Sequence, residues 1–378
     1  MPVPSARAMP VLSRVVGALP ATVPFVPPEA LERRADRSLT LRLGANESAF
    51  GPSARAIAAL ADAAPRVSWY GDPEGFELRH ALAGHHGVAA DAIVLGSGID
   101  ELLGLIVRAH MNPGDTAVMS AGAYPTFAYH VIGYGGVLER PAYGTAGDTA
   151  HYHNDWQALA DAAHRTAARL VYLSNPDNPT GSWLDGDAVL ALLDALPPGT
   201  LLVLDEAYAE FAPAEALPIL AADDPRVIRL RTFSKAHGLA GLRVGYAIGA
   251  VPLIATFDKI RNHFGMTRLA LAAALASLGD VDHVAGVVEA VAAGRRELAA
   301  LAAHHGLDAL PSATNFVAMD LGDSTRAKAV LAALLEREGV FIRTPGVAPL
   351  DRLIRVTVGT PPERTAFAEA FGRVLETV

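Results

Sequence analysis

The sequence predicts an α/β protein with a mostly parallel sheet, followed by a smaller α+β domain. Between about residues 90 and 250, short runs of apolar residues alternate with helical patterns. Strands that are apolar along their whole length are typical of parallel sheets covered by helices on both faces. Beyond about residue 275 the pattern changes to long alanine-rich helices and further short strands. We therefore expect a large domain over residues 46–274, a small domain over residues 275–378, and an N-terminal arm over residues 1–45 that contributes to the small domain.

Polar or glycine-rich segments accompany the strands expected in the large domain. These strands are 92–95, 116–120, 170–173, 201–204, 227–230 and 242–248. In open parallel sheets the ligand binds beyond the carboxyl ends of the strands. The polar segments should therefore meet at one edge of the sheet and form a single site. The later part of the chain is expected to contain helices 269–278, 284–304 and 325–337, and strands beginning near 314, 340 and 353.

The composition excludes several classes of function. The chain of 378 residues is 51% hydrophobic with a formal net charge of −9, which argues against binding nucleic acid or an anionic membrane surface. No apolar run approaches membrane-spanning length. The absence of cysteine rules out disulfides, thiolate zinc sites and a cysteine nucleophile, and leaves a cytoplasmic location as the expectation. Three histidine pairs have no matched third ligand, so we expect no metal site.

Lys235 is a candidate catalytic residue because lysine is scarce in this chain. The other two lysines, Lys259 and Lys328, lie in helical segments, whereas Lys235 lies in a loop rich in serine and glycine after an apolar strand. Arginine can supply a bare positive charge, but it cannot lose its proton and form an imine. The alternative interpretation is that a lysine-poor chain must keep its few lysines somewhere.

Two further segments are candidates for binding a charged ligand. Gly96 to Asp100 forms a glycine turn between a strand and a helix, whose backbone N–H groups would hold a phosphate. Glu101 stands where the third glycine of a dinucleotide fingerprint belongs, and a plain tight turn remains an alternative. Asp205 ends an apolar strand, where a carboxylate needs a cation such as a protonated ring nitrogen. A helix N-cap is the alternative role for Asp205.

Taken together, these residues fit pyridoxal 5′-phosphate. The cofactor presents a phosphate, an aromatic face, a phenolic oxygen, a ring nitrogen and an aldehyde that a lysine can hold. A phosphate cradle, an aromatic residue after the next strand, an asparagine, an aspartate, a tyrosine and a Ser-Lys pair occur in this chain in that order.

From about Asn46 to Thr360 the sequence resembles the fold-type I, class I/II aminotransferases, and specifically the histidinol-phosphate aminotransferase family. The motifs that carry this resemblance are Ala45-Asn46-Glu47-Ser48, Tyr70-Gly71-Asp72-Pro73, Gly96 to Glu101, Ser174 to Gly181, Asp205-Glu206-Ala207-Tyr208, Ser234-Lys235, Gly241 to Gly245 and Ile354 to Gly359. The resemblance implies a seven-stranded, mostly parallel sheet, pyridoxal phosphate as cofactor, and a homodimer with a shared active site. It also implies transfer of an amino group from a histidinol-phosphate-like donor to 2-oxoglutarate.

The resemblance assigns roles to individual residues. Lys235 would form the Schiff base and Asp205 would pair with the ring nitrogen. The remaining cofactor contacts would be Asn178 and Tyr208 at the ring oxygen, Phe127 stacked on the ring, and Gly98, Ile99, Asp100, Ser234, Arg243 and a second subunit's Tyr70 at the phosphate. The substrate contacts would be Arg355 at the carboxylate, Arg343 near the side chain, and Asn46.

Several departures from the family pattern keep other substrates open. Phe127 stands in place of a tyrosine, Phe25-Val26-Pro27-Pro28 replaces a Tyr-Val-Pro-Gly pattern, and Asn262 to Met266 differs from the usual Asn-Pro-Phe stretch. An aromatic or other bulky amino acid is therefore an alternative substrate. A decarboxylase or lyase on the same scaffold is an alternative reaction. A ligand-sensing regulator would need a DNA-binding extension, and the first 45 residues are too short and insufficiently basic for one.

Overall fold

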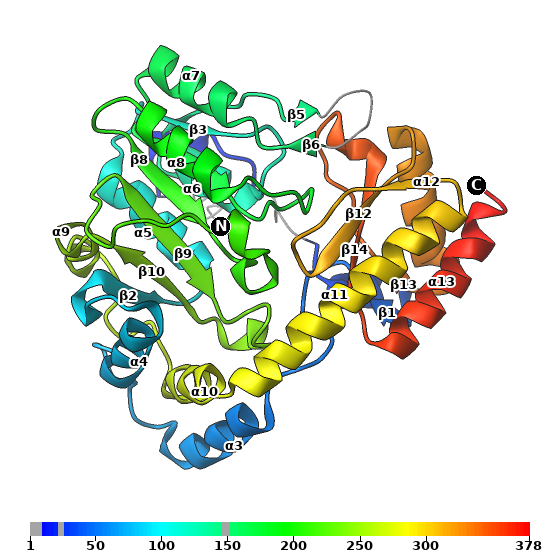
Figure 1. The fold of residues 1–378 in the computed structure, drawn as a ribbon, viewed down its shortest axis with the longest axis horizontal. Helices are drawn as coiled ribbons and strands as arrows, with labels where there is room; N and C mark the ends of the chain where they lie inside the picture. The colour runs from blue at the N-terminus through cyan, green and yellow to red at the C-terminus, as the bar shows by residue number, and fades with distance from the viewer. Residues whose placement is uncertain (1–9, 22–25, 146–151) are drawn as a thin grey trace, which may run out of the picture.

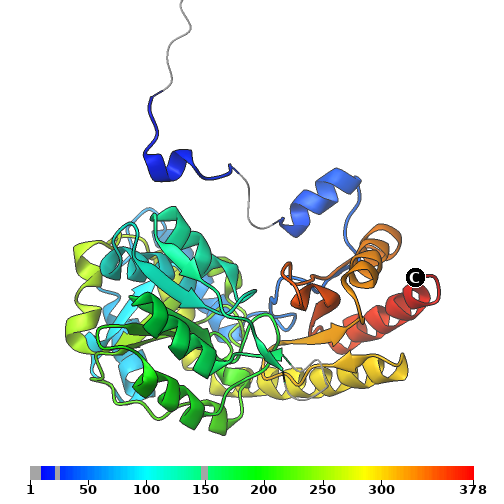
Figure 2. The ribbon, with the colours of Figure 1, turned by 90° about the horizontal axis from the view of Figure 1, so that it is seen from above.

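A computed structural model describes residues 10–21, 26–145 and 152–378. The chain forms a large α/β part and a smaller part, and the long helix α11 (Val281–His304) extends from one to the other (Figure 1). The described N-terminal residues, including α1 (Arg14–Gly17), extend over the outside of the molecule (Figure 2). Phe25 lies outside the described residues. The division of the chain at residues 45 and 274 stays a prediction.

The large part is built on a seven-stranded sheet. In spatial order its strands are β2 (Ile93–Gly96), β10 (Gly245–Gly249), β9 (Val227–Thr232), β8 (Leu201–Asp205), β7 (Leu170–Ser174), β3 (Thr116–Met119) and β4 (Val137–Glu139). Only β10 is antiparallel to its neighbours β2 and β9, and the other pairs are parallel. The predicted α/β class with a mostly parallel seven-stranded sheet is confirmed.

The strands are apolar throughout because helices cover both faces of the sheet. In β8, Leu201 and Val203 pack in a core shared with α5 (Ile99–His110), while Leu202 and Leu204 pack in a core shared with α7 (Trp156–Thr166). Successive side chains of a strand point to opposite faces, so this alternation places an apolar residue on each side. With both faces of the sheet covered by helices, the ends of the strands are left as the place where a ligand can bind.

The other helices of the large part are α3 (Ala54–Ala63), α4 (Phe76–His86), α6 (Pro125–Gly133), α8 (Gly186–Ala195), α9 (Val251–Ile254) and α10 (Arg268–Leu278). A short hairpin pairs β5 (Gly144–Thr145) with β6 (Tyr152–His153). The strand expected from residue 242 begins only at Gly245, because a short 3₁₀ turn ends at Leu242 and Arg243 adopts the left-handed conformation with a φ of 56°.

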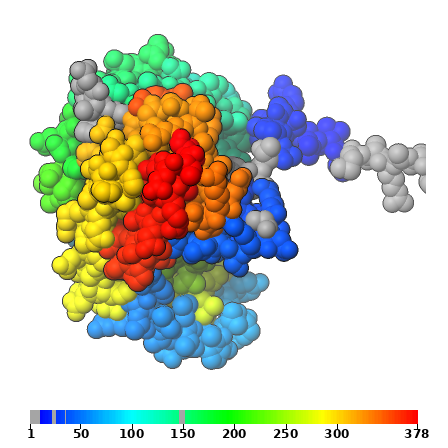
Figure 3. Space-filling view, turned by 90° about the vertical axis from the view of Figure 1, so that its right-hand side faces the viewer, coloured from blue at the N-terminus to red at the C-terminus, as the bar shows by residue number. Residues whose placement is uncertain are grey.

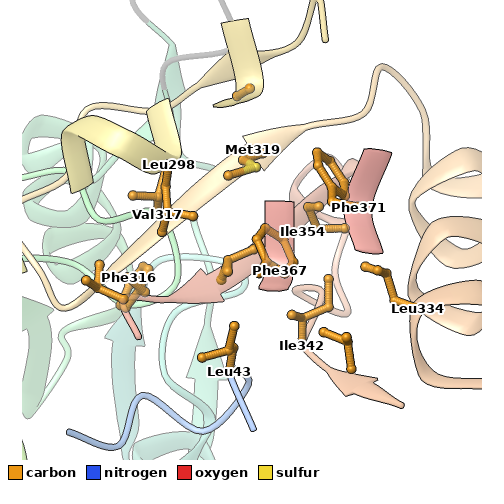
Figure 4. Packing of buried hydrophobic residues seen from close by; sticks show 14 of the residues in the cluster. Leu43, Leu298, Phe316, Val317, Met319, Leu334, Ile342, Ile354, Phe367 and Phe371 are labelled. Carbon is orange, nitrogen blue, oxygen red and sulfur yellow. The ribbon is translucent and has the colours of Figure 1, made fainter. Parts of the chain in front are cut away.

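The smaller part has its own core between an antiparallel sheet and helices. The sheet contains β11 (Asp308–Ala309), β12 (Phe316–Asp320) and β14 (Leu353–Thr357), and a parallel pair joins β1 (Leu41–Arg42) to β13 (Val340–Phe341). The helices are α2 (Pro28–Ala35), α11, α12 (Ser324–Ala333) and α13 (Pro361–Leu375). Phe367 and Phe371 of α13 stack at 5.4 Å, and Leu43 packs in the same core (Figure 4). Figure 3 shows α13 on the outer face beside α11.

Within the described ranges, no single helix combines the length and hydropathy needed to cross a membrane. The pair α10 and α11 passes this test of length and composition only together, and a bend of 78° separates the two helices.

The buried His237 and the half-buried His86 make the stability of the fold depend on pH. His86 shares a hydrogen bond of 2.8 Å with the Tyr246 hydroxyl, and His237 one of 2.9 Å with the Ser277 hydroxyl. Burial disfavours the imidazolium and lowers the pKa of His86 to about 3 and that of His237 to about 4. In the unfolded chain both groups take up a proton near pH 6.5. The contribution of the two neutral histidines to the free energy of unfolding is therefore complete above that pH, and it is lost as the pH falls toward 4.

We predict that His237→Gln makes the free energy of unfolding less sensitive to acid. A histidine whose pKa is lowered by folding makes the free energy of unfolding change by about 1.4 kcal/mol per pH unit between its folded and unfolded pKa values. Urea unfolding at intervals between pH 6.5 and 4.5 should show a slope smaller by roughly this amount than in the wild type. The exposed His263→Gln is the control and should keep the wild-type slope. Equal slopes for all three proteins would contradict the prediction.

Candidate active site

A cavity of about 690 Å³ lies at the carboxyl ends of the central strands. Ser174 ends β7, Asp205 ends β8 and Thr232 ends β9, and all three residues line the cavity. Arg355 of β14 lines it from the smaller part. The cavity thus lies where parallel sheets bind ligands, and both parts of the chain contribute to its wall.

Most of the residues that the sequence singles out are brought together in this wall. They are Asn46, Ile99, Asp100, Asn178, Asp205, Tyr208, Ser234, Lys235, Arg243, Arg343 and Arg355. The roles of these residues in binding and catalysis stay predictions. Three further predicted residues, Gly98, Phe127 and Tyr70, are not in the wall and are described below.

Lys235 is poised to lose its proton. Its Nζ donates a hydrogen bond of 2.9 Å to the backbone oxygen of Asn46. Burial, together with the neighbouring cations Arg355 and Arg243, lowers the pKa of Lys235 to about 8. A substantial fraction of the amine is therefore neutral near pH 7.5, as a nucleophile or general base requires. The lysine loop also needs Gly238, because a Cβ at that residue would lie 2.3 Å from the backbone oxygen of Gly51.

Asp205 is a buried carboxylate that forms no ion pair within the described residues. Its Oδ2 accepts a hydrogen bond of 2.7 Å from the Tyr172 hydroxyl, and its Oδ1 accepts one of 3.0 Å from the Ala207 N–H. Burial raises the pKa of Asp205 to about 6, and these hydrogen bonds oppose the rise. A cationic ring nitrogen in the cavity would complete its environment.

A polar network lies between Asp205 and the smaller part. The Tyr208 hydroxyl accepts hydrogen bonds from the side-chain amides of Asn46 at 2.9 Å and Asn178 at 3.5 Å. The Asn178 Oδ1 in turn accepts a hydrogen bond from Arg355. Burial raises the pKa of Tyr208 to about 12, so its hydroxyl keeps its proton and can donate to a ligand oxygen. The amide of Asn178 and the hydroxyl of Tyr208 can both serve a phenolic oxygen.

The guanidinium of Arg355 has hydrogen-bond partners for only some of its N–H groups. One Nη donates to the backbone oxygen of Gly44 at 3.3 Å, and the Nε is buried without a hydrogen-bond partner. Burial lowers the pKa of Arg355 to about 10. A half-buried guanidinium with a buried, unsatisfied Nε donor fits an anionic ligand group. Arg343 lies nearby, where one Nη donates at 3.2 Å to the backbone oxygen of Val26 in the N-terminal arm.

Gly98 shapes the expected phosphate site without lining the cavity. It precedes the first turn of α5 with a φ of 83°, and a Cβ there would lie 2.4 Å from an Nη of Arg243. The freed space admits the guanidinium, which donates to Asp100 at 3.2 Å and to Ser234 at 3.4 Å. The N–H groups of the helix terminus, a hydroxyl and a guanidinium thus converge as a phosphate requires.

Phe127 does not line the cavity, which leaves its predicted stacking on the cofactor ring without support in this structure. It is fully buried in the core and stacks instead on Tyr172, with ring centroids 4.9 Å apart and planes 14° apart. Helix α6 begins at Pro125, so Tyr124 just before it lines the cavity while Phe127 turns toward the sheet. The Tyr124 hydroxyl donates to Asp100 at 3.1 Å. A proline at the first helical position is a signal that could have indicated Tyr124.

Tyr70 lies away from this chain's cavity. It is 78% exposed and its ring lies 4.9 Å from that of Phe264. Arg268 holds the segment by donating at 2.8 Å to the backbone oxygen of Tyr70. The expectation that Tyr70 serves a second subunit is compatible with this position and stays a prediction.

The family model of aminotransferase class I and II matches residues 40–371. The chain is 38% identical over 352 residues to histidinol-phosphate aminotransferase 1 of Mesorhizobium japonicum. This match covers 92% of this chain and 93% of the relative. The chain is 37% identical to the histidinol-phosphate aminotransferase of an Anaeromyxobacter species over 97% of this chain and all of that one. It is 46% identical to the crystal structure of histidinol-phosphate aminotransferase from Sinorhizobium meliloti in complex with pyridoxal 5′-phosphate, with a TM-score of 0.93 over 98% of this chain and 99% of that one.

The fold, the site and this match over almost the whole chain define a class I and II aminotransferase, an enzyme class that depends on pyridoxal phosphate. Within that class the chain belongs to the histidinol-phosphate aminotransferase family. The resemblance predicted from the motifs is confirmed, as are the enzyme class and the cofactor.

We predict that Gly98→Ala weakens cofactor binding at least tenfold. The added methyl group would occupy the place of the Arg243 guanidinium, and loss of one charge-assisted contact to a phosphate is worth about 1.5 kcal/mol or more. Equilibrium dialysis against pyridoxal phosphate measures the change. Gly114→Ala is the matched control, because Gly114 has a similar φ of 92° but open space around it. It should lose stability and keep its cofactor, and equal losses in both variants would contradict the role of Gly98.

Proposed function

We propose that the protein transfers an amino group between histidinol phosphate, or a closely similar phosphorylated amine, and 2-oxoglutarate. The observation that carries the proposal is a lysine of lowered pKa that shares one cavity with a half-buried arginine and with a buried carboxylate that has no ion pair among the described residues. Relatives named for histidinol phosphate cover almost the whole chain and support the donor. The acceptor comes from the resemblance of the motifs alone.

The residues of the cavity fit the cofactor group by group. Asp205 would face the ring nitrogen, and Asn178 with Tyr208 would hold the ring oxygen. Tyr124, in place of Phe127, would lie against the ring. The phosphate would bind the first N–H groups of α5 together with Ser234 and Arg243. When bound, the cofactor supplies an aldehyde for Lys235 and a ring that accepts electrons.

In this reaction three residues of the chain have separate roles. The Lys235 amine takes a proton from the substrate Cα and returns a proton to the neighbouring carbon. Asp205 keeps a proton on the ring nitrogen, because a buried carboxylate without another cation favours a charged partner. Arg355 orients the substrate by its anionic group. Histidinol phosphate has no carboxylate, so the same arginine would meet a phosphate in one half-reaction and a carboxylate in the other.

An aromatic amino acid is the second candidate donor, and the observations in its favour are weaker. One of its grounds was a hydroxyl lost at Phe127, yet Tyr124 supplies a hydroxyl at the cavity. Phe25 lies outside the described residues. The remaining ground is the segment around Phe264, which packs against Tyr70. A decarboxylase or lyase would use the same lysine and aspartate, and only the fate of the amino group separates it from a transferase.

We predict that Lys235→Ala abolishes transamination. Without the amine no group is in place to move the Cα proton, and the expected loss is at least a thousandfold in kcat. The assay offers histidinol phosphate, phenylalanine and tyrosine with 2-oxoglutarate, and then oxaloacetate and pyruvate as other acceptors. Lys328→Arg on the exposed face of α12 is the control and should keep full activity. Turnover of Lys235→Ala at the wild-type rate would refute the proposed chemistry, and a preference for phenylalanine would refute the proposed donor.

We also propose a homodimer in which Tyr70 completes the phosphate site of the second subunit. Trp69, Tyr70 and Phe264 form an exposed aromatic group on one side of the large part, where a second copy can cover them. Arg268 lies over the Trp69 ring and fixes this group in place.

We predict that Tyr70→Ala and Lys235→Ala complement each other. Each variant alone should be nearly inactive. Coexpressed in equal amounts, half of the dimers are mixed and each mixed dimer has one intact site, so about a quarter of wild-type activity should return. The control coexpresses Lys235→Ala with Asp205→Ala, whose residues lie in the wall of the same cavity. In a mixed dimer of this pair one site lacks Lys235 and the other lacks Asp205, so both sites are defective and no activity should return. Failure of the first pair to complement would refute sharing through Tyr70.

A further inference from the structure

Tyr172 reaches Asp205 across two neighbouring strands. In the register of β7 and β8, Tyr172 lies opposite Val203, two residues before Asp205. Residues two apart on a strand share a face, so Tyr172 and Asp205 are diagonal neighbours on the same side of the sheet. A long aromatic side chain can span that diagonal, and the Tyr172 hydroxyl donates to Oδ2 of Asp205 at 2.7 Å.

The position of Tyr172 is fixed by its surroundings. The side chain is 1% exposed, and its ring stacks on that of Phe127 from α6. A buried hydroxyl without a partner would be costly, so the ring and the hydrogen bond hold each other in place. Tyr172 does not line the cavity, so its effect on a ligand there would act through Asp205.

We propose that Tyr172 is a positioning residue, which sets the rotation of the Asp205 carboxylate and favours its ionised form for the cofactor's ring nitrogen. The inference rests on the proposed role of Asp205. With Oδ2 bound to Tyr172 and Oδ1 bound to the Ala207 N–H, both oxygens are fixed and one lone pair on each remains for the cavity. Phe127 contributes to the same positioning, because its ring stacks on that of Tyr172 from the side of helix α6.

The charges around Asp205 explain why such a donor is needed. Burial raises the pKa of Asp205, and the nearby carboxylates Asp100 at the start of α5 and Glu206 just after β8 raise it further. The hydroxyls of Tyr172 on β7 and Tyr208 after β8 also face this region, and Lys235 lies across the cavity. The hydrogen bond from Tyr172 opposes the rise in pKa. Without it, more of the carboxyl would be protonated near neutral pH and unable to accept from a pyridinium.

The test compares pyridoxal phosphate with its 1-deaza analogue, in which a C–H replaces the ring nitrogen. Dissociation constants are measured by equilibrium dialysis for the full-length wild type and for Tyr172→Phe. The wild type should prefer pyridoxal phosphate. In Tyr172→Phe this preference should fall about tenfold or more, the size expected for a hydrogen bond to a charged group, while binding of the analogue stays within about twofold. The pH below which pyridoxal phosphate binding weakens should also rise.

Tyr246→Phe is the matched control, because it removes another buried tyrosine hydroxyl with a hydrogen bond of 2.8 Å, here to His86. It should keep the wild-type preference. A second comparison places Tyr172→Phe in an Asp205→Asn background, where it should no longer change the preference. Equal preferences in the wild type and Tyr172→Phe, or an equal fall in Tyr246→Phe, would overturn the inference. If the wild type itself bound both compounds equally, the role proposed for Asp205 would fail, and the inference would fail with it.

Discussion

The site depends on a buried carboxylate, Asp205, that pairs with no cation in the part of the chain that the structure describes. Asp205 and Glu206 are consecutive at the end of β8, and their side chains leave the strand on opposite faces. Glu206 is neutralised by Arg229 at 3.0 Å and Arg231 at 2.9 Å. Asp205 receives only neutral donors within the described residues. Because an isolated buried charge is costly, the environment of Asp205 is incomplete until a cationic group enters the cavity.

The two parts of the chain are joined through the residues that carry the chemistry. The core of the smaller part includes Tyr208 and Ala236, which flank the carboxylate and the lysine in sequence. Arg355 bonds to Asn178 of the large part, and Arg295 of α11 donates to the backbone oxygens of Phe211 and Thr314. A movement of the smaller part would therefore displace the arginine together with the loops around the cofactor site. The residues proposed for substrate recognition and those proposed for cofactor binding are therefore connected by direct contacts.

The sequence predicts those features that depend on strand order and fails for those that depend on contacts distant in sequence. Apolar runs place Asp205 and Lys235 near strand ends, and parallel strands bring those ends together. The orientation of an aromatic residue at a helix start is different, because a shift by one turn exchanges cavity and core, as with Tyr124 and Phe127. The need for Gly98 arises from Arg243, almost 150 residues later. The bond of Tyr172 to Asp205 requires a register that no local pattern contains.

The positive charge of the cavity links substrate binding to proton transfer. Arg355 lowers the pKa of Lys235 because both cations share a poorly solvated space. When a carboxylate or phosphate binds Arg355, its charge is neutralised and this part of the depression is relieved. In the role proposed for it, Lys235 would then be a stronger base when such a substrate is bound. An anionic substrate group can therefore contribute to the rate as well as to affinity, and a substrate without one would bind beside a weaker base.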